Sequence, residues 1–209
     1  MKNKIVFVIC FFIITSCGNS SLPIYGERQV IVKIIDGKQV ADTIYQTVPN
    51  FSLTNQDGKL ITENLIKNKI YIADFFFVTC PTICPRMKKN LLKVYETYKD
   101  NQEVLILSHT IDPEHDTVEV LKNYADRLGA DSKQWHFLTG KREKIYELAE
   151  HGYYSIAVSD TSEPGGYVHS GGLILVDKKR RVRGIYDGTN ESATAKLILD
   201  ISTLMHEKE

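Results

Sequence analysis

Hydrophobic and polar residues alternate along residues 29–48, in two stretches that are separated by Asp36 and Gly37. A period of two is typical of a β-strand with one covered face, and Asp-Gly is a frequent turn between two paired strands. The pattern predicts an N-terminal β-hairpin, which we interpret as an accessory ribbon.

Further apolar stretches predict the strands of a central sheet. Two of them are almost continuously apolar, which is typical of strands that are buried on both faces of a parallel or mixed sheet. The last stretch predicts a hairpin with its turn at residues 178–180. The expected strands cover residues 49–62 with a turn at Asp57-Gly58, 69–78, 103–112, 135–140 and 171–188.

Stretches with helical periodicity lie between and after these strands, at residues 85–100, 117–129, 142–152 and 192–209. In the first of them, Met87, Leu91 and Val94 fall on one broad face, and the lysines, including Lys88, fall mostly opposite. Gly129 and Gly152 are expected to end the second and third helices. The order strand, helix, strand predicts a right-handed crossover between parallel strands.

The first residues resemble a signal peptide. Lys2 and Lys4 precede an apolar run at residues 5–14, which is shorter than the ~20 residues that span a bilayer. The residues before Cys17 resemble the lipobox of bacterial lipoproteins. We therefore predict a signal peptide at residues 1–16, a lipidated tether at 17–28 that begins with Cys17, and one domain at 29–209. A plain secretory signal or an N-terminal anchor helix is the alternative.

On each of these interpretations the domain works outside the cytoplasm, and a lipoprotein would be membrane-anchored on the periplasmic side of a bacterium.

The 209 residues are 43% hydrophobic, which suits one globular domain with its own core. The 26 basic residues equal the 26 acidic residues, and no long run of either sign occurs. This composition shows no nucleic-acid footprint.

Cys80 and Cys84 are separated by three residues, each precedes a proline, and both lie between a predicted strand and a predicted helix. If Cys10 leaves with the signal peptide and Cys17 carries lipid, they are the two thiols of the domain. A cysteine pair in this turn, with helices around a mixed sheet, resembles the thioredoxin fold. The positive end of the helix dipole lowers the pKa of a nearby thiol. If both cysteines lie in the first helical turn, their sulfurs are spaced to share one metal ion.

Other uses of the pair are less well supported. A structural disulfide that closes so small a loop adds little stability to a domain of this size. Disulfide exchange of the thioredoxin type usually uses two intervening residues and a proline before a later strand, whereas this chain has His169 in the loop that enters that strand. Peroxiredoxins place Thr or Ser three positions before the reactive cysteine and Pro seven before it. Phe77 and Ala73 occupy these positions, which excludes a peroxidase of that class.

Two thiolates and one imidazole form a ligand set for copper. Thiolates select Cu(I), and an added imidazole with an open position suits Cu(II). Zinc accepts the same ligands, but structural zinc normally has four of them.

Four stretches together resemble the Sco/SenC family of copper-binding proteins with a thioredoxin fold, which assist the assembly of cytochrome c oxidase. The resemblance runs in order over residues 49–205, and its motifs are FFFVTCPTICPRM, SHTIDPEHDTVEVLKNYA, WHFLTGKREKIYELA and YVHSGGLILVDKKRRVRGIYDGT. It implies an α/β, thioredoxin-like fold with a central mixed β-sheet flanked by helices. It also implies that Cys80, Cys84 and His169 bind copper and that His169 folds back onto the cysteines. Many members carry an acidic residue before this histidine, where the chain has Val168.

The resemblance leads to the hypothesis of a membrane-anchored copper metallochaperone. It would bind Cu(I) and Cu(II) and pass copper to the copper-bearing subunit of cytochrome c oxidase, at the CuA site. Cys80 and Cys84 would also form a redox-active pair that a thiol reductant keeps reduced. A thiol-disulfide oxidoreductase that reduces the oxidase cysteines, and a redox or copper sensor, remain alternatives, so enzymatic activity stays open.

Several polar residues receive structural interpretations. Asp74 lies on a buried strand, either as a hydrogen-bonded core carboxylate or as a proton-handling group. Asp112 is interpreted as a residue that caps a turn. His109 is expected to be a packed side chain. The remaining histidines, His115, His136, His151 and His206, are expected to be solvated in loops or near helix ends.

Overall fold

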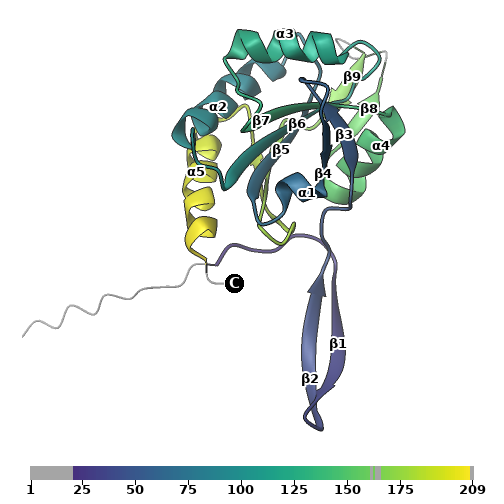
Figure 1. The fold of residues 1–209 in the computed structure, drawn as a ribbon, viewed down its shortest axis with the longest axis vertical. Coiled ribbons are helices and arrows are strands. Elements are labelled where there is room, and N and C mark those ends of the chain that lie inside the picture. The colour runs from purple at the N-terminus through teal and green to yellow at the C-terminus, as the bar shows by residue number, and fades with distance from the viewer. Residues whose placement is uncertain (1–20, 161, 163–165, 208–209) are drawn as a thin grey trace, which may run out of the picture.

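The computed structural model describes residues 21–160, 162 and 166–207, and it confirms the predicted α/β fold. A central mixed sheet has seven strands in the order β11-β10-β5-β6-β7-β3-β4. Helices lie on both sides of this sheet, and a long hairpin projects from one end of the domain (Figure 1). The expected lipoprotein signal at residues 1–16 and the lipidated Cys17 lie outside the described residues.

The strands of the sheet follow the apolar stretches of the sequence. Strands β5, β6 and β7 run parallel to one another, while β10, β11, β3 and β4 are added antiparallel at the two sides. Every residue of β5 and β6 is buried, because these strands are central and covered on both faces. The seven strands are β3 (Ser52–Asn55), β4 (Leu60–Thr62), β5 (Ile70–Phe76), β6 (Val104–Thr110), β7 (Trp135–Thr139), β10 (Gly172–Val176) and β11 (Val182–Asp187).

The predicted helices are all present, with two additions. A short helix follows β4, and the third predicted helix continues as a π-helical turn that ends at Gly152. Gly129 has the left-handed conformation, with φ 67°, that ends α3. The helices are α1 (Glu63–Ile66), α2 (Cys84–Thr97), α3 (Val118–Leu128), α4 (Arg142–Glu147), the π-helical turn η1 (Leu148–Gly152) and α5 (Glu191–His206). None of the helices in the described part of the chain is long and apolar enough to cross a membrane.

The predicted N-terminal hairpin consists of β1 (Arg28–Ile35) and β2 (Lys38–Tyr45), and it forms a two-stranded sheet of its own. Its turn is at Asp36 and Gly37, which both have positive φ, at 49° and 72°. This is the backbone of a tight turn between strands, for which Asp-Gly is well suited. Two other strands, β8 (Ala157–Ser159) and β9 (Tyr167–His169), form a second small ribbon that the sequence did not predict.

The tether is fixed to the domain by Arg183 of β11. The guanidinium of Arg183, which is 3% exposed, donates hydrogen bonds to the carbonyl oxygens of Leu22 and Pro23 at 2.6 and 3.0 Å. It also forms ion pairs with Asp177 and Glu207. Arg183 thus joins the start and the end of the described chain at one point on the sheet.

Two of the expectations for polar residues are wrong. His136 is not solvated: it is 4% exposed, because β7 lies inside the sheet between β6 and β3. Lys88 does not lie on the polar face of α2. It is 2% exposed, and its ammonium contacts the Asp74 carboxylate at 2.5 Å. The packed position expected for His109 is confirmed, with its ring stacked on Phe75 at 5.0 Å between centroids.

The stability of the metal-free protein is expected to fall as the pH falls below about 6.5, in part because of His109. Burial lowers the pKa of His109 to about 4, whereas an unfolded chain titrates there near ~6.5. Between these values the unfolded state binds a proton that the folded state does not, so the free energy of unfolding decreases toward low pH. When the pH is lowered from 7 to 5, the free energy of unfolding of His109→Phe should decrease by about 2 kcal/mol less than that of the wild type. Urea unfolding measures this, with the exposed His206→Phe as control, and equal losses in all three proteins would contradict it.

Candidate metal centre

The two cysteines lie in different local structures. Cys84 is the first residue of α2, and Pro85 follows in the first turn, where proline is favoured because the missing N–H needs no partner. Cys80 lies in the loop between β5 and α2. The condition that both cysteines lie in the first helical turn is therefore not met, whereas the predicted start of this helix near residue 85 agrees with the structure. Nevertheless, the backbone N–H groups of Thr82 and Cys84 donate hydrogen bonds to the Cys80 sulfur. Unpaired N–H groups at the start of α2 therefore stabilise a thiolate on Cys80, although Cys80 lies outside the helix.

His169 is the last residue of β9 and does not lie in a loop as the sequence suggested. The ribbon pairs Ala157 with His169 and Val158 with Val168. Strands of three residues are too short for an alternating pattern to stand out. The ribbon holds the histidine, which is 8% exposed, against the cysteines.

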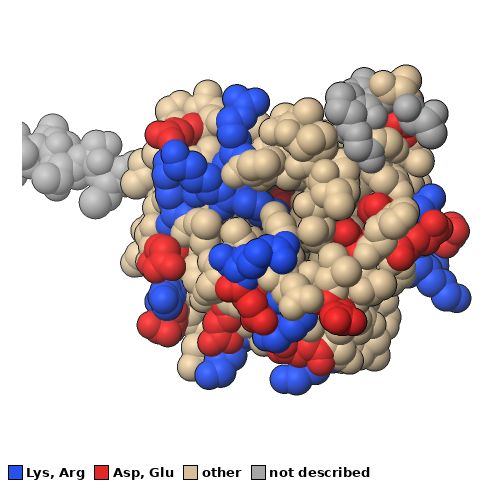
Figure 2. Space-filling view, turned by 90° about the horizontal axis from the view of Figure 1, so that it is seen from above, with Lys and Arg blue, Asp and Glu red and all other residues tan. Residues whose placement is uncertain are grey.

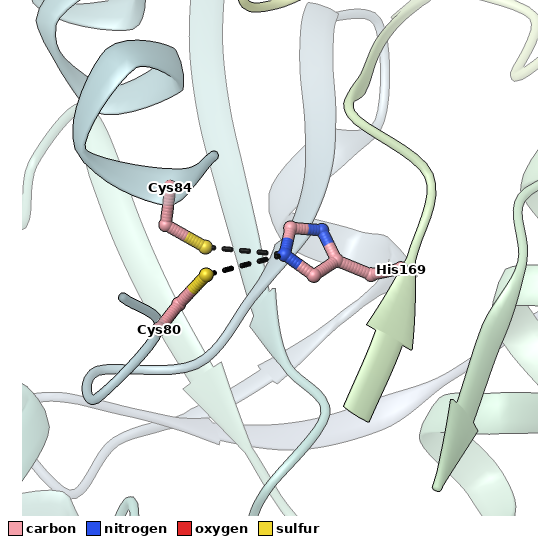
Figure 3. A group of neighbouring side chains, drawn as sticks. All are labelled: Cys80, Cys84 and His169. Atoms are coloured by element: carbon pink, nitrogen blue, oxygen red, sulfur yellow. Dashed lines mark hydrogen bonds between the residues drawn. The ribbon is translucent and has the colours of Figure 1, made fainter. Parts of the chain in front are cut away.

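The three residues meet at one point, although His169 is more than eighty residues away in the sequence (Figure 3). The Nε2 atom of His169 lies 3.2 Å from the Cys84 sulfur and 3.8 Å from the Cys80 sulfur. All three ligand atoms lie within 4.8 Å of one another, and the three side chains are buried. Among the described residues, this is the one group of at least three Cys, His, Asp or Glu side chains that could hold a metal ion.

The two thiols are electrostatically unequal. The hydrogen bond from Cys84 lowers the pKa of Cys80 to about 3, and the backbone N–H groups of Thr82 and Cys84 act in the same direction. The same contact with Cys80 raises the pKa of Cys84, and burial adds to this increase. At neutral pH the metal-free pair therefore holds one thiolate, on Cys80, and one thiol, on Cys84. Metal binding must release the Cys84 proton.

The backbone fixes which nitrogen of His169 faces the sulfurs. Nδ1 lies 3.4 Å from the carbonyl oxygen of Ser170, which can only accept a hydrogen bond, so Nδ1 carries the proton. Nε2 then presents its lone pair to Cys80 and Cys84. An imidazole that donates its other N–H to a carbonyl is a common arrangement for a metal ligand. Phe77 packs edge-on against the ring at 5.9 Å and covers it from one side.

Tyr167 connects β9 to the turn after β6. Its hydroxyl donates a 2.7 Å hydrogen bond to Asp112, and its ring lies 5.2 Å from that of Phe77. Asp112 is 4% exposed and also contacts His115. Asp112 thus lies outside the metal-binding group and holds the turn and the histidine strand together. The sequence analysis did not single out Tyr167, although its position two residues before His169 on a strand places both side chains on one face.

Asp116 holds the cysteine loop from the same turn. Its carboxylate accepts hydrogen bonds from the backbone N–H of Val78, at 3.0 Å, and from the hydroxyl of Thr110, at 2.5 Å. The DPEHD segment therefore supports both halves of the site, through Asp112 and through Asp116. The sequence offered a signal for this role, because short acidic side chains after a strand often accept backbone N–H groups in turns.

Tyr167→Phe is expected to lower the affinity for Cu(II) between about threefold and tenfold, which is the effect of one lost hydrogen bond that orients a ligand. The Cu(I) affinity should change less, since the two sulfurs do not depend on β9. Competition titrations with each ion measure both values. Tyr146→Phe is the matched control, because the Tyr146 hydroxyl donates to the Ile111 carbonyl in the same turn without touching β9. Equal effects of the two variants would contradict the role of Tyr167.

The surface at this end of the domain has separate charged regions (Figure 2). Lys and Arg side chains gather on the side where α2 lies, and this helix exposes Arg86, Lys89 and Lys93. Acidic side chains lie at the edges of this region, along the lower part of the view and on the opposite side, with uncharged surface between the two sides. A protein that approaches this end therefore meets an uneven field that favours particular orientations.

Comparison with known proteins decides the family. The SCO1/SenC family model matches residues 40–206, which is most of the chain. The chain belongs to the SCO1/SenC family. A SCO1/SenC family lipoprotein from Bacillus anthracis superposes with a TM-score of 0.70 at 29% identity, covering 77% of this chain and 95% of that one.

Two further SCO1/SenC structures are similar. BsSco, described as a member of the Sco family of cytochrome c oxidase assembly proteins with a disulfide switch, has a TM-score of 0.68 at 30% identity and covers 78% of this chain and 95% of its own. ScoI of Bradyrhizobium japonicum, solved with copper bound, has a TM-score of 0.63 at 25% identity and covers 76% of this chain and 99% of its own. Copper, the metal predicted from the sequence, is thus confirmed as a metal of this family.

The donor set of this SCO1/SenC chain fits copper. Two sulfurs and one imidazole nitrogen are buried together, and soft sulfur donors select Cu(I) while the imidazole also suits Cu(II). Val168, which precedes the histidine, pairs with Val158 across the ribbon and supplies no charge.

Proposed function

We propose that this SCO1/SenC protein is a copper metallochaperone that carries copper between Cys80, Cys84 and His169 and passes it to the copper-bearing subunit of cytochrome c oxidase, at the CuA site. The observation that carries the proposal is the convergence of two sulfurs and one Nε2 atom within 4.8 Å. Three ligands leave a position open, through which an acceptor ligand can enter before the donor ligands leave. The oxidase is proposed as recipient because BsSco belongs to a family of oxidase assembly proteins.

We further propose that the protein is anchored to the membrane through a lipid on Cys17 and that the domain works on the periplasmic side. The support is the apolar run at residues 5–14 followed by a lipobox-like sequence, together with the description of the B. anthracis relative as a lipoprotein. An anchored chaperone meets a membrane-bound oxidase on one surface, which raises the encounter frequency.

The proposal is tested by copper loading and transfer. The reduced chain from Ser20 onward contains every described helix and strand and has Cys80 and Cys84 as its two thiols. It should bind one Cu(I) in competition with a chelator and then deliver it to the copper-free CuA domain of the host oxidase. Cys84→Ser should lose tight binding and delivery, while Ser170→Ala should keep both. Binding that is indifferent to Cys84 would contradict the proposal.

A thiol-disulfide oxidoreductase is the second candidate, and the electrostatics of the cysteines favour it. A Cys80 thiolate beside a Cys84 thiol is the form of a dithiol that can attack a disulfide and then resolve it. Such an enzyme would turn over a disulfide of the oxidase without needing His169. His169→Ala therefore separates the two functions, because it should spare disulfide reduction and impair copper delivery.

A further inference from the structure

One face of the β1–β2 hairpin carries no charge between residues 30 and 43, and Arg28 lies on the same face at the base of the hairpin. Residues that are paired across an antiparallel ribbon share a face, and alternate residues along a strand share it too. Val30, Val32 and Ile34 of β1 are 66%, 63% and 76% exposed, and their partners on β2 are uncharged. We name this set the uncharged face: Val30, Val32, Ile34, Gln39, Ala41 and Thr43.

The opposite face of the hairpin carries its charges. Lys33 pairs with Val40 and Ile31 pairs with Asp42, so Lys33 and Asp42 are diagonal neighbours on this face. Their side chains form an ion pair at 2.6 Å. Lys38 and Ile35 lie on the same face, at the end next to the turn. This face also exposes apolar side chains, namely Ile35, Val40 and Ile44 at 52%, 43% and 51%. The two faces therefore differ in charge, and the face without charge is the one that loses least by leaving water for an apolar surface.

The domain itself does not cover the uncharged face. The hairpin projects from the end of the domain opposite to β9 and pairs with none of the strands of the central sheet (Figure 1). An isolated two-stranded ribbon is marginally stable in water, and a strand with an exposed apolar face usually has a partner. The family model begins at residue 40, inside β2, so β1 lies outside the part that is shared with the family.

The path of the tether indicates what this partner is. Arg183 fixes Leu22 and Pro23 to β11, and the hairpin starts at Arg28, only a few residues later. Four residues lie between Cys17 and Leu22, and the five steps from one Cα to the next span at most ~18 Å. A strand of the length of β1 extends over ~26 Å. A lipid attached to Cys17 therefore brings the membrane surface within the reach of the hairpin.

We propose that the uncharged face of the hairpin lies on the surface of the lipid bilayer to which the chain is anchored. Together with the tether, it holds the domain with β9, and hence the metal centre, turned away from the lipid. The inference rests on the lipid anchor of the proposed function. Anchoring raises the effective concentration of lipid at the hairpin, so a few apolar side chains are enough to keep it in contact.

Tryptophan probes on the two faces test this contact in the mature, lipid-bearing chain reconstituted into phosphatidylcholine vesicles. The native Trp135 is fully buried and gives a constant background. With brominated acyl chains in the vesicles, Ile34→Trp should lose most of the fluorescence that the introduced tryptophan contributes. Its emission should lie at shorter wavelength than that of a tryptophan in water. Ile35→Trp, the neighbour on the charged face, should be quenched much less, and Val158→Trp on β8 at the far end should not be quenched.

Several results would overturn the inference. Unquenched fluorescence at Ile34, or equal quenching at Ile34 and Ile35, would show that the uncharged face does not lie on lipid. If the complex had the mass of two chains and the tryptophan at position 34 were shielded from lipid, the uncharged face would be a contact between two copies of the chain. Val32→Trp repeats the measurement on the same face if Ile34→Trp does not fold.

The same preparation separates this inference from the anchor. Mass spectrometry of the N-terminal peptide shows whether Cys17 carries lipid. A chain without lipid would contradict the anchor and, with it, the hairpin contact, while copper delivery by Cys80, Cys84 and His169 would stand. A chain with lipid whose Ile34→Trp is not quenched would contradict the hairpin contact alone.

Discussion

Replacing His169 by alanine is expected to lower the affinity for Cu(II) by about 100-fold or more, roughly 3 kcal/mol, and the affinity for Cu(I) by less than about tenfold. Cu(I) is held well by two soft sulfurs, and these come from the loop after β5 and the start of α2. Cu(II) gains more from an imidazole nitrogen, and the Nε2 atom of His169 is the only nitrogen in the described metal-binding group.

Two titrations measure this difference, one with Cu(I) against a chelator and one with Cu(II) followed by visible and EPR spectroscopy. The sulfur-to-Cu(II) charge-transfer band should weaken or vanish in His169→Ala. The matched control is His206→Ala, since His206 is exposed at the end of α5. Equal losses of Cu(I) and Cu(II) affinity in His169→Ala would show that the histidine supports the fold of the site and does not distinguish the two ions.

The parts of the fold that follow from local chemistry could be predicted from the sequence. Asp36-Gly37 and Gly129 mark a turn and a helix end because their backbones need positive φ, and both positions are as expected. The buried strands β5 and β6 were visible as apolar runs. The ribbon of β8 and β9 was not, because three residues carry too little pattern and its pairing is set by tertiary contacts.

The resemblance implied the members of the candidate site and the return of His169 onto the cysteines, but not the β8–β9 ribbon that carries this histidine. The resemblance to the SCO1/SenC family gave Cys80, Cys84 and His169, and the structure brings these three together. The helix was predicted to start at residue 85, with Cys80 outside it, and Pro85 supports this start because proline favours the first helical turn. The inequality of the two thiols depends on their mutual contact, on backbone N–H groups and on burial in the folded domain, and burial is not encoded in a local pattern.

Lys88 shows where a pattern was present but misinterpreted. It is four residues after Cys84 and three before Leu91, so it shares their face of α2, and all three are buried. Lysine was assigned to the polar side by its chemistry alone. The structure keeps it inside because Asp74, Ser108 and the Phe76 ring surround its ammonium, at 2.5, 3.0 and 4.1 Å. Asp74 is therefore a hydrogen-bonded core carboxylate with a buried cation as its partner.

Lys88→Met is consequently expected to destabilise the protein by about 3–5 kcal/mol at pH 7. The methionine fills a similar volume, but the variant leaves the Asp74 carboxylate, which is 0% exposed, with the Ser108 hydroxyl as its remaining side-chain donor. An uncompensated charge in the core is far more costly than the loss of the ion pair itself. Urea unfolding of the reduced, metal-free chain measures the change.

Two further variants show whether the unpaired charge of Asp74 causes the loss of stability in Lys88→Met. Lys89→Met alters the exposed neighbour on the same helix and should change the stability by less than about 0.5 kcal/mol. Asp74→Asn combined with Lys88→Met removes both charges and should recover much of the loss, because the two residues are in contact and their effects do not add. If Lys88→Met were as mild as Lys89→Met, water would have to reach Asp74, and the core beneath Cys84 would be open where the structure shows it closed.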